Sequence, residues 1–301
     1  MGKPHVGGRA MAPLLALAAV SLAVLGFAAP ALAGKPTGRY ANFSQCPLKV
    51  TGVNFCIFGQ TSSGEFKIKK TQVPITKTIT LQGGIIVPES GGETFVNAAN
   101  GETLSKTPEN VPGGLLKIIA PKGWPEILQV IFNEFISKGI TGVNASTELV
   151  GNVTISRGSL LAGLPDALGL PVRVHLENSF LGSGCYVGSK AHPVNLELTT
   201  GATSPPLPNE SIKGSLGEPE FIEEDGEDAL LVLRKNSLVN NTFSAPEAEG
   251  CGSQYFFGLF TGLIDDAVDA ELGLPSASGN NTAILDGTLE NASATAVKRS
   301  E

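Results

Sequence analysis

Short runs of alternating apolar and polar residues recur along this chain and predict β-strands. Phe66 and Ile68 alternate with charged neighbours, which is the pattern of a half-buried strand. Two later runs each place their apolar residues on one face, and these residues are Val172, Val174 and Leu176 in one and Val194, Leu196 and Leu198 in the other. The strand candidates lie at residues 54–60, 65–73, 77–87, 147–156, 170–178 and 192–200. Short strands at this spacing predict a mainly β fold, with sandwich or barrel-like sheets.

Two stretches instead show the helical spacing of apolar residues. Residues 121–139 have Pro125 at a suitable first turn and Gly139 as a stop, and residues 261–275 have Thr261 as a candidate N-cap. The apolar positions are Ile127, Leu128, Ile131, Phe132 and Phe135 in the first stretch, and Leu263, Ile264, Ala267, Val268 and Leu272 in the second. Both predicted helices are short and amphipathic, so we expect them to cover a sheet face or an open end of the sheets.

The N-terminal residues 1–33 have the pattern of an export signal. Lys3 and Arg9 form a basic start, residues 13–27 are apolar, and residues 31–33 match the small-residue cleavage site. The alternative is a membrane-spanning helix, but a span needs about 20 apolar residues and no stop-transfer charges follow. We therefore predict a cleaved signal peptide at 1–33, and we expect no transmembrane segment in the rest of the chain.

The remaining residues 34–301 form the predicted mature β-rich region. Gly occurs 37 times and Pro 20 times, a composition that favours short strands joined by tight turns. The region is near the upper size for one core, so a single domain and two packed lobes dividing near 118–140 are both reasonable. The proline-rich segment 199–209 is predicted to be an extended, exposed loop.

The charge balance narrows the choice of partners. The chain has 21 Lys and Arg against 28 Asp and Glu, a formal net charge of −7. Removal of the signal, with Lys3 and Arg9, makes the protein more acidic still. Nucleic acid and anionic lipid both require clustered basic residues, so neither is expected as a partner.

Four cysteines follow the predicted signal: Cys46, Cys56, Cys185 and Cys251. An even number in an exported protein is typical of disulfides, and four cysteines allow three pairings. Residues 46–56 resemble a hairpin whose turn centres on Thr51 and Gly52, which favours a Cys46–Cys56 bond. The Cys185–Cys251 bond then follows by elimination.

Cys185 lies between His175 and His192, an arrangement that could suggest a cysteine nucleophile with a histidine base. A cysteine in a structural disulfide has no thiolate, and the papain-type signature has its histidine more than a hundred residues downstream. His175 falls within a predicted strand, where a lone histidine is more often a surface or packing residue. With no zinc-ligand spacing and no G-x-S-x-G elbow either, we expect no catalytic site, metal or cofactor.

Carboxylates provide the remaining candidate chemistry. One acidic cluster consists of Glu223, Glu224, Asp225, Glu227 and Asp228. It lacks the EF-hand pattern, and Asp225-Gly226 favours a hairpin, although a weak calcium site at the tip is an alternative. A pair such as Glu177 and Glu197 could serve a carboxylate-dependent hydrolase if the fold brought the two together.

Several segments together resemble a group of exported proteins from high-GC Gram-positive bacteria, for which no activity is established. The segments are residues 101–116, 170–189, 198–209, 238–252 and 272–285. The resemblance implies export and no particular mechanism. We predict a secreted, disulfide-stapled β-rich protein that is free outside the membrane or loosely wall-associated, and that binds an unknown envelope or extracellular ligand. A secreted hydrolase, assisted by calcium, is the alternative.

Overall fold

A computed structural model describes residues 1–2, 34–112, 114, 123–130, 142–224, 227–254 and 258–301. The chain divides into a unit Met1–Gly34 and a compact unit Lys35–Glu301. The predicted signal falls almost entirely outside the described residues, as do residues 118–122 and 131–140 of the predicted lobe boundary. Within the described residues, no helix has both the length and the apolar character needed to cross a bilayer.

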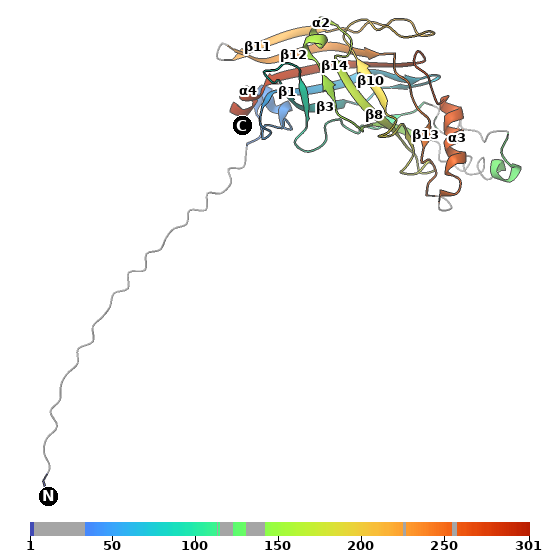
Figure 1. Ribbon diagram of the computed structural model, residues 1–301, viewed down its shortest axis with the longest axis horizontal. Coiled ribbons are helices and arrows are strands. Elements are labelled where there is room, and N and C mark those ends of the chain that lie inside the picture. The colour runs from blue at the N-terminus through green and yellow to red at the C-terminus, as the bar shows by residue number, and fades with distance from the viewer. Residues whose placement is uncertain (3–33, 113, 115–122, 131–141, 225–226, 255–257) are drawn as a thin grey trace. The chain divides into compact units, whose positions relative to one another are not determined.

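The first sheet, called sheet A, has seven strands in antiparallel pairs (Figure 1). The strands are β1 (Val53–Ile68), β2 (Thr71–Pro74), β3 (Ile79–Ile86), β4 (Thr94–Asn97), β11 (Glu218–Glu224), β12 (Glu227–Asn240) and β14 (Asn281–Ser293). Their order is β11-β12-β14-β1-β3-β4, and β2 pairs with β1. The centre of sheet A is therefore formed by two strands from opposite ends of the unit, β1 and β14.

The second sheet, called sheet B, is built around β8, and its pairs are also antiparallel. Its strands are β5 (Glu109–Asn110), β6 (Asn144–Leu149), β7 (Thr154–Ile155), β8 (Leu168–Glu177), β9 (Tyr186–Val187), β10 (Val194–Leu198) and β13 (Ala248–Glu249). β8 pairs with β6, β7, β9 and β10. Alternate residues of β8 and β10 are buried, as the sequence pattern predicts.

One hydrophobic core contains residues of both sheets. Ile57, Ile85 and Leu289 come from sheet A, while Val172 and Leu196 come from sheet B. Burial of such faces is the main stabilising term in a two-sheet fold. The described strands leave both sheets open, since each has two edge strands. The predicted mainly β fold, with a few short helices, is therefore confirmed.

A smaller second core lies on the other side of sheet A, under the helices η1 (Gly38–Phe43) and α4 (Ala294–Arg299). It contains Tyr40, Phe43 and Val297 together with the Cys46–Cys56 disulfide. Thr37 donates a side-chain hydrogen bond to the Ser300 carbonyl (2.8 Å), so the first and last segments of the unit are joined here.

The hairpin predicted for residues 46–56 is wrong, although its disulfide is present. Residues 46–52 form turns, and β1 begins only at Val53. Both edges of β1 are occupied from its start, because Phe55 pairs with Ile85 of β3 and with Ser293 of β14. No edge is left for the residues around Cys46, and Pro47 has no N–H to donate to a ladder.

Two strands of sheet A carry a bulge at the same level. The register shifts in β1 between Thr61 and Ser63, and in β12 between Arg234 and Asn236. Thr61 and Asn236 both pair with Gly287 of β14. The two strands that neighbour β14 therefore each have a bulge at the level of Gly287.

Each bulge changes which residues of its strand face the core, because the side-chain period of a strand is two. On β12, Leu233 faces the core before the bulge, whereas Leu238 does so after it. Lys235 is the extra residue and has a positive φ of 54°. The inserted residue turns Asn236 inward, and Asn236 is 4% exposed.

The predicted helix at 261–275 is present as α3 (Thr261–Leu272), which ends at Gly273 as expected. Its predicted cap is wrong. Phe260 occupies the N-cap position without a side-chain hydrogen bond, and Thr261 is the first helical residue and donates to the Gly258 carbonyl. In the predicted helix at 121–139, residues 126–130 are helical, and residues 121–122 and 131–139 lie outside the described residues. α2 (Arg157–Ala162) is a further short helix.

The acidic cluster lies in the predicted hairpin. β11 and β12 are antiparallel, and Glu224 pairs with Glu227. The turn residues 225 and 226 lie outside the described residues, so the calcium alternative at the tip stays a prediction. Among the described residues, no group of three or more His, Cys, Asp or Glu side chains is placed to hold a metal ion.

Candidate functional site

A cavity of about 140 Å³ lies between the two sheets. Its wall is mostly apolar, and sheet A contributes Phe66, Leu81 and Leu285 while sheet B contributes Leu170 and Val174. An apolar cavity of about 150 Å³ inside a protein stays dry and can take up a small apolar molecule. The cavity is therefore the candidate binding site of this molecule.

The cavity follows the length of β8. All five inward residues of this strand line it: Leu168, Leu170, Val172, Val174 and Leu176. Eight residue steps in a strand extend about 26 Å, at roughly 3.3 Å per residue. A volume of about 140 Å³ distributed over this length is narrow. Its shape therefore suits a linear chain better than a ring.

One side of the cavity adjoins the surface near β2 and the end of α3. Thr71, Val111 and Leu272 line both the cavity and a surface depression that Lys70 and Glu271 also line. These three residues therefore separate the cavity from the depression. A ligand that enters from this side passes the last turn of α3.

A buried carboxylate fixes the wall beside this entrance. Glu109 is 4% exposed and lines the cavity. It accepts hydrogen bonds from the Thr76 N–H (3.0 Å), the Thr76 hydroxyl (2.7 Å) and the Lys77 N–H (2.7 Å). Burial alone would raise the pKa of Glu109, but these hydrogen bonds and the Lys77 charge lower the pKa below its usual value. Glu109 thus holds the loop at 76–77 with its oxygens already engaged.

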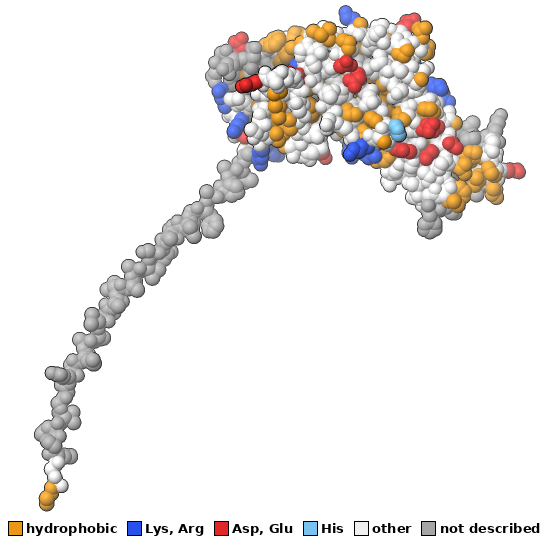
Figure 2. Space-filling model, viewed as in Figure 1, with side chains coloured by type: hydrophobic (Ala, Val, Ile, Leu, Met, Phe, Trp, Pro, Cys, Tyr) orange, Lys and Arg blue, Asp and Glu red, His pale blue; other side chains and the backbone are white. Residues whose placement is uncertain are grey.

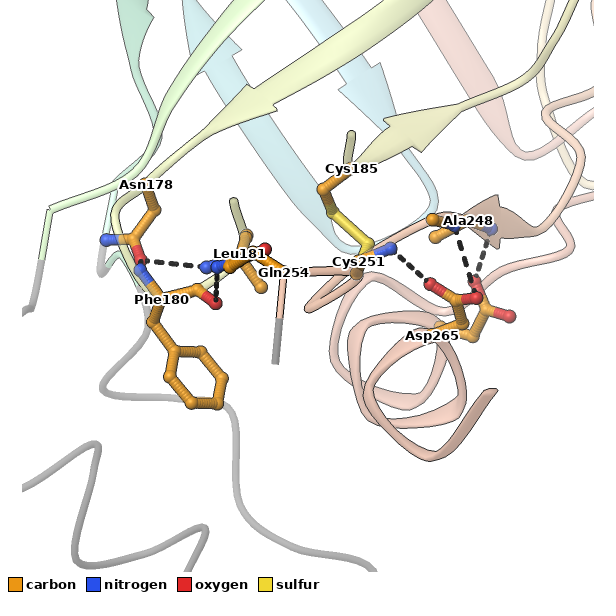
Figure 3. The surroundings of a disulfide bond; sticks show 10 residues. Asn178, Phe180, Leu181, Cys185, Ala248, Cys251, Gln254 and Asp265 are labelled. Atoms are coloured by element: carbon orange, nitrogen blue, oxygen red, sulfur yellow. Dashed lines mark hydrogen bonds between the residues drawn. A yellow bond between two sulfur atoms is a disulfide. The ribbon is translucent and has the colours of Figure 1, made fainter. Parts of the chain in front are cut away.

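The Cys185–Cys251 disulfide joins the segment before β9 to the segment before α3 (Figure 3). The pairing is the one that the sequence favours, and all four cysteines of the chain are in disulfides. Leu176 donates its N–H to the Cys185 carbonyl (2.9 Å), and Gly252 donates to the Leu181 carbonyl (2.7 Å). Cys185 is completely buried, and because its sulfur is bonded to Cys251 it has no thiolate that could act as a nucleophile.

Two carboxylates of α3 bind the backbone beside this disulfide. Asp265 accepts from the N–H groups of Cys251 (2.8 Å) and Gly250 (3.3 Å), and Asp269 accepts from the Ala248 N–H (2.7 Å). Burial, together with the nearby acidic charges, raises the pKa of Asp265 above its usual value. For Asp269 the same causes, burial first, raise the pKa to about 6. The sequence predicts the helix that carries both residues, but it does not indicate this backbone-binding role.

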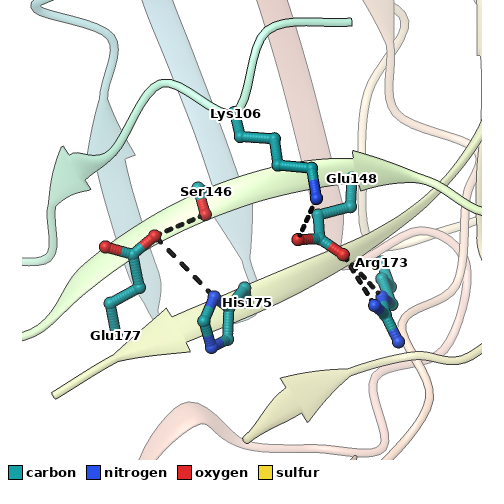
Figure 4. Close-up of polar contacts among 6 residues, drawn as sticks. All are labelled: Lys106, Ser146, Glu148, Arg173, His175 and Glu177. Carbon is teal, nitrogen blue, oxygen red and sulfur yellow. Dashed lines mark hydrogen bonds and ion pairs between the residues drawn. The ribbon is translucent and has the colours of Figure 1, made fainter. Parts of the chain in front are cut away.

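The outer face of sheet B carries His175 in a polar cluster (Figure 4). Ser146 and His175 are opposite each other on β6 and β8, but the Ser146 hydroxyl donates to Glu177 (2.7 Å) and not to the imidazole. The His175 Nδ1 atom lies 3.7 Å from the same carboxylate, and its ring stacks on Tyr186. Ser146 is also only 2% exposed, so these three polar groups do not form a nucleophile–base pair.

The same face continues as an ion-pair network (Figure 4). Glu148 binds the Arg173 guanidinium (2.7 Å) and the Lys106 ammonium (2.9 Å), and Arg173 lies over the Tyr186 ring. Burial would raise the pKa of Glu148, but its bonds to Lys106 and Arg173 lower the pKa below its usual value. Each charged group in the network has an oppositely charged partner, which indicates a structural role.

The other sequence candidates are not brought together. Glu197 on β10 pairs with Gly169 at one end of β8, whereas Glu177 is at the other end, about 26 Å along the strand. A glycosidase pair requires carboxyls within roughly 10 Å. Burial, and to a lesser degree the Asp166 charge, raises the pKa of Glu197, but Glu177 lies too far away to act with it. His192 is exposed in a turn.

Comparison of this chain with protein-family models, with curated proteins and with solved structures finds no match in any of the three. On the face shown in Figure 2, Lys and Arg side chains lie in separate groups among acidic ones, so this face has no large basic patch.

Of the features described above, the cavity is the one whose geometry points most directly to a ligand. Its lining was missed in the sequence because alternation identifies inward residues but not the space left between two facing sheets.

Proposed function

We propose that this protein is exported and acts as a non-catalytic binding module, which holds an apolar ligand in the cavity between its sheets. The observation that carries the proposal is the apolar lining that both sheets contribute along β8. Two disulfides support an oxidising, extracytoplasmic location. The ligand belongs to the envelope or the extracellular medium, where the module is free or loosely associated with the wall.

Export is tested by expressing the chain in a high-GC Gram-positive host and fractionating the culture. The protein is expected in the medium or in a salt wash of the wall, with Gly34 as its first residue by N-terminal sequencing. Recovery of the uncleaved chain in the cytoplasm would remove the localisation part of the proposal.

Ligand binding is tested by NMR on protein with ¹³C-labelled Leu and Val methyl groups. Titration with n-hexane is expected to shift the methyl signals of cavity residues such as Leu170, Val174 and Leu285. The methyl groups of Leu207, which is 87% exposed, provide the internal control. Shifts spread evenly over surface methyl groups, or no shifts, would contradict a binding cavity.

A further inference from the structure

Two polar side chains of the cavity wall have no hydrogen-bond partner. Asn236 and Thr61 both line the cavity, and neither side chain makes a hydrogen bond with the residues that the structure describes. Both residues pair with Gly287, one from each side of β14. They therefore lie at the same level of sheet A, about 10 Å apart across two strand spacings.

Three other asparagines, Asn240, Asn241 and Asn291, each have a buried Oδ1 atom without a hydrogen-bond partner, but none of the three lines this cavity. Asn281, which is completely buried, donates to the Phe243 carbonyl (2.8 Å) and accepts from the Ser276 hydroxyl (2.7 Å). Asn236 is 4% exposed and makes no such bonds. Buried polar groups in native proteins are nearly always hydrogen-bonded, so a group that lacks a partner suggests a missing one.

The bulge in β12 explains how Asn236 comes to face the cavity. The extra residue at Lys235 reverses the alternation of β12, so that Asn236 and not its neighbour faces inward. Thr61 precedes the bulge of β1 and lines the cavity through the regular alternation of the strand, together with Gly59 two residues earlier. Bulges are common where a strand must direct a side chain toward a ligand.

The lining also restricts the charge of the ligand. None of the described lining residues is Lys, Arg or His, so no cation is available to pair with an anionic group. The one charged residue in the lining is Glu109, and its oxygens accept hydrogen bonds from Thr76 and Lys77. A charged group in this site would be buried without a counter-ion, which is costly.

We propose that the cavity takes a linear apolar chain that carries one neutral hydroxyl or carbonyl group, and that Asn236 and Thr61 bind this group. The narrow shape of the cavity along β8 favours a linear chain over a ring. The unpaired Asn236 amide and Thr61 hydroxyl favour a ligand with a neutral polar group that can hydrogen-bond to them. This inference rests on the proposed binding function and specifies its ligand class.

The test compares the affinities of four probes: n-hexane, 1-hexanol, hexanoate at pH 7 and cyclohexanol. Each is titrated into the methyl-labelled protein. We expect 1-hexanol to bind at least tenfold more tightly than hexanoate, because hexanoate would bury an unpaired charge. Cyclohexanol is expected to bind more weakly than 1-hexanol because a ring is wider. Equal binding of 1-hexanol and hexanoate, or tighter binding of cyclohexanol, would overturn the assignment.

Two variants test whether Asn236 and Thr61 bind the polar group of the ligand. Asn236→Leu and Thr61→Val keep side-chain size and remove the hydrogen-bonding groups. Asn236→Leu is expected to lower the 1-hexanol affinity about tenfold relative to that of n-hexane, and Thr61→Val by a smaller factor. Asn195→Leu, the same change at an exposed position of β10, is the matched control and should leave the ratio unchanged.

The outcomes separate the two proposals. If n-hexane and 1-hexanol both bind, and neither variant changes the ratio of their affinities, the assignment of Asn236 and Thr61 is wrong while the binding function stands. If no probe binds to the wild-type protein, both proposals fall. The affinities of 1-hexanol and n-hexane are compared within the same variant. A general loss of stability would lower both affinities, so it would not change their ratio.

Discussion

At the scale of single residues, Asp269 gives the protein a specific pH dependence. Its pKa is about 6 in the folded protein, against an ordinary value of 3.8. A raised folded pKa means that the folded state binds the proton more tightly than the unfolded state. The stabilising contribution of Asp269 is therefore complete below pH 3.8 and is lost as the pH rises through about 6.

We predict that Asp269→Asn removes this dependence while keeping an oxygen for the Ala248 N–H. One pKa unit corresponds to about 1.4 kcal/mol, and solvent screens a carboxylate that is partly exposed. Above pH 6 the variant is therefore expected to be more stable than the wild type by about 1 kcal/mol, and near pH 4 the two should converge. Urea unfolding midpoints between pH 4 and pH 7.5 measure the difference, and parallel curves would contradict it.

The roles of single residues were predictable where the chemistry is intrinsic to the residue type. Four cysteines behind a predicted export signal predict disulfides, and a lone histidine on a strand predicts a surface or packing residue and not a base. The function of Asp265 and Asp269 depends on the backbone at residues 248–251. Sequence spacing does not show that this segment returns to α3, so only the helix itself could be predicted.

At the scale of elements, the pairing of β1 with β14 depends on Gly287. A Cβ atom added there would overlap the backbone carbonyl oxygen of Gln60. We predict that Gly287→Ala lowers the free energy of unfolding by about 3 kcal/mol, because backbone atoms at the centre of a sheet cannot move aside easily. Urea denaturation monitored by circular dichroism provides the measurement.

Gly262 is the matched control for this substitution. It lies in α3, is exposed, and has no atom within 4 Å of the position that a Cβ would take. Alanine is favoured over glycine in a helix by up to about 1 kcal/mol, so Gly262→Ala should stabilise the protein slightly. Equal effects of the two substitutions would show that close packing at Gly287 is not the cause.

The strands that the sequence predicts are those whose faces differ in polarity. β8 and β10 alternate regularly because one face of each is in the core. β14 has no such pattern, since polar residues such as Thr288 and Asn291 are partly buried on its two faces. The sequence therefore does not predict β14, one of the two central strands of sheet A. The bulges, which depend on the register of three strands, could not be predicted from one segment.

At the scale of the whole molecule, the two disulfides contribute unequally to stability. Cys46–Cys56 closes a ring with a sequence separation of 10, and Cys185–Cys251 one of 66. The loop-closure estimate gives about 3 kcal/mol for the short ring and about 4 kcal/mol for the long one. We predict that Cys185→Ala with Cys251→Ala lowers the urea midpoint more than Cys46→Ala with Cys56→Ala. The reverse order would indicate that the second core depends on its disulfide beyond loop closure.

The cavity lowers the stability of the folded protein and provides the space in which a ligand can bind. Ala145 of β6 lines the cavity, so Ala145→Leu places additional methylene groups in a space that is otherwise unfilled. Burial of apolar surface there is expected to raise the free energy of unfolding by about 1 kcal/mol and to abolish the methyl shifts caused by n-hexane. Ala191→Leu, at an exposed position, should change neither property.

Only a real internal space produces both effects of Ala145→Leu together. In a densely packed interior the added groups would force neighbours apart and lower the stability. A gain in stability with retained n-hexane binding would place the binding elsewhere in the molecule. A protein that keeps an unfilled cavity gives up stability that a single substitution could recover. We infer that the cavity persists because the ligand, when bound, supplies the missing contacts.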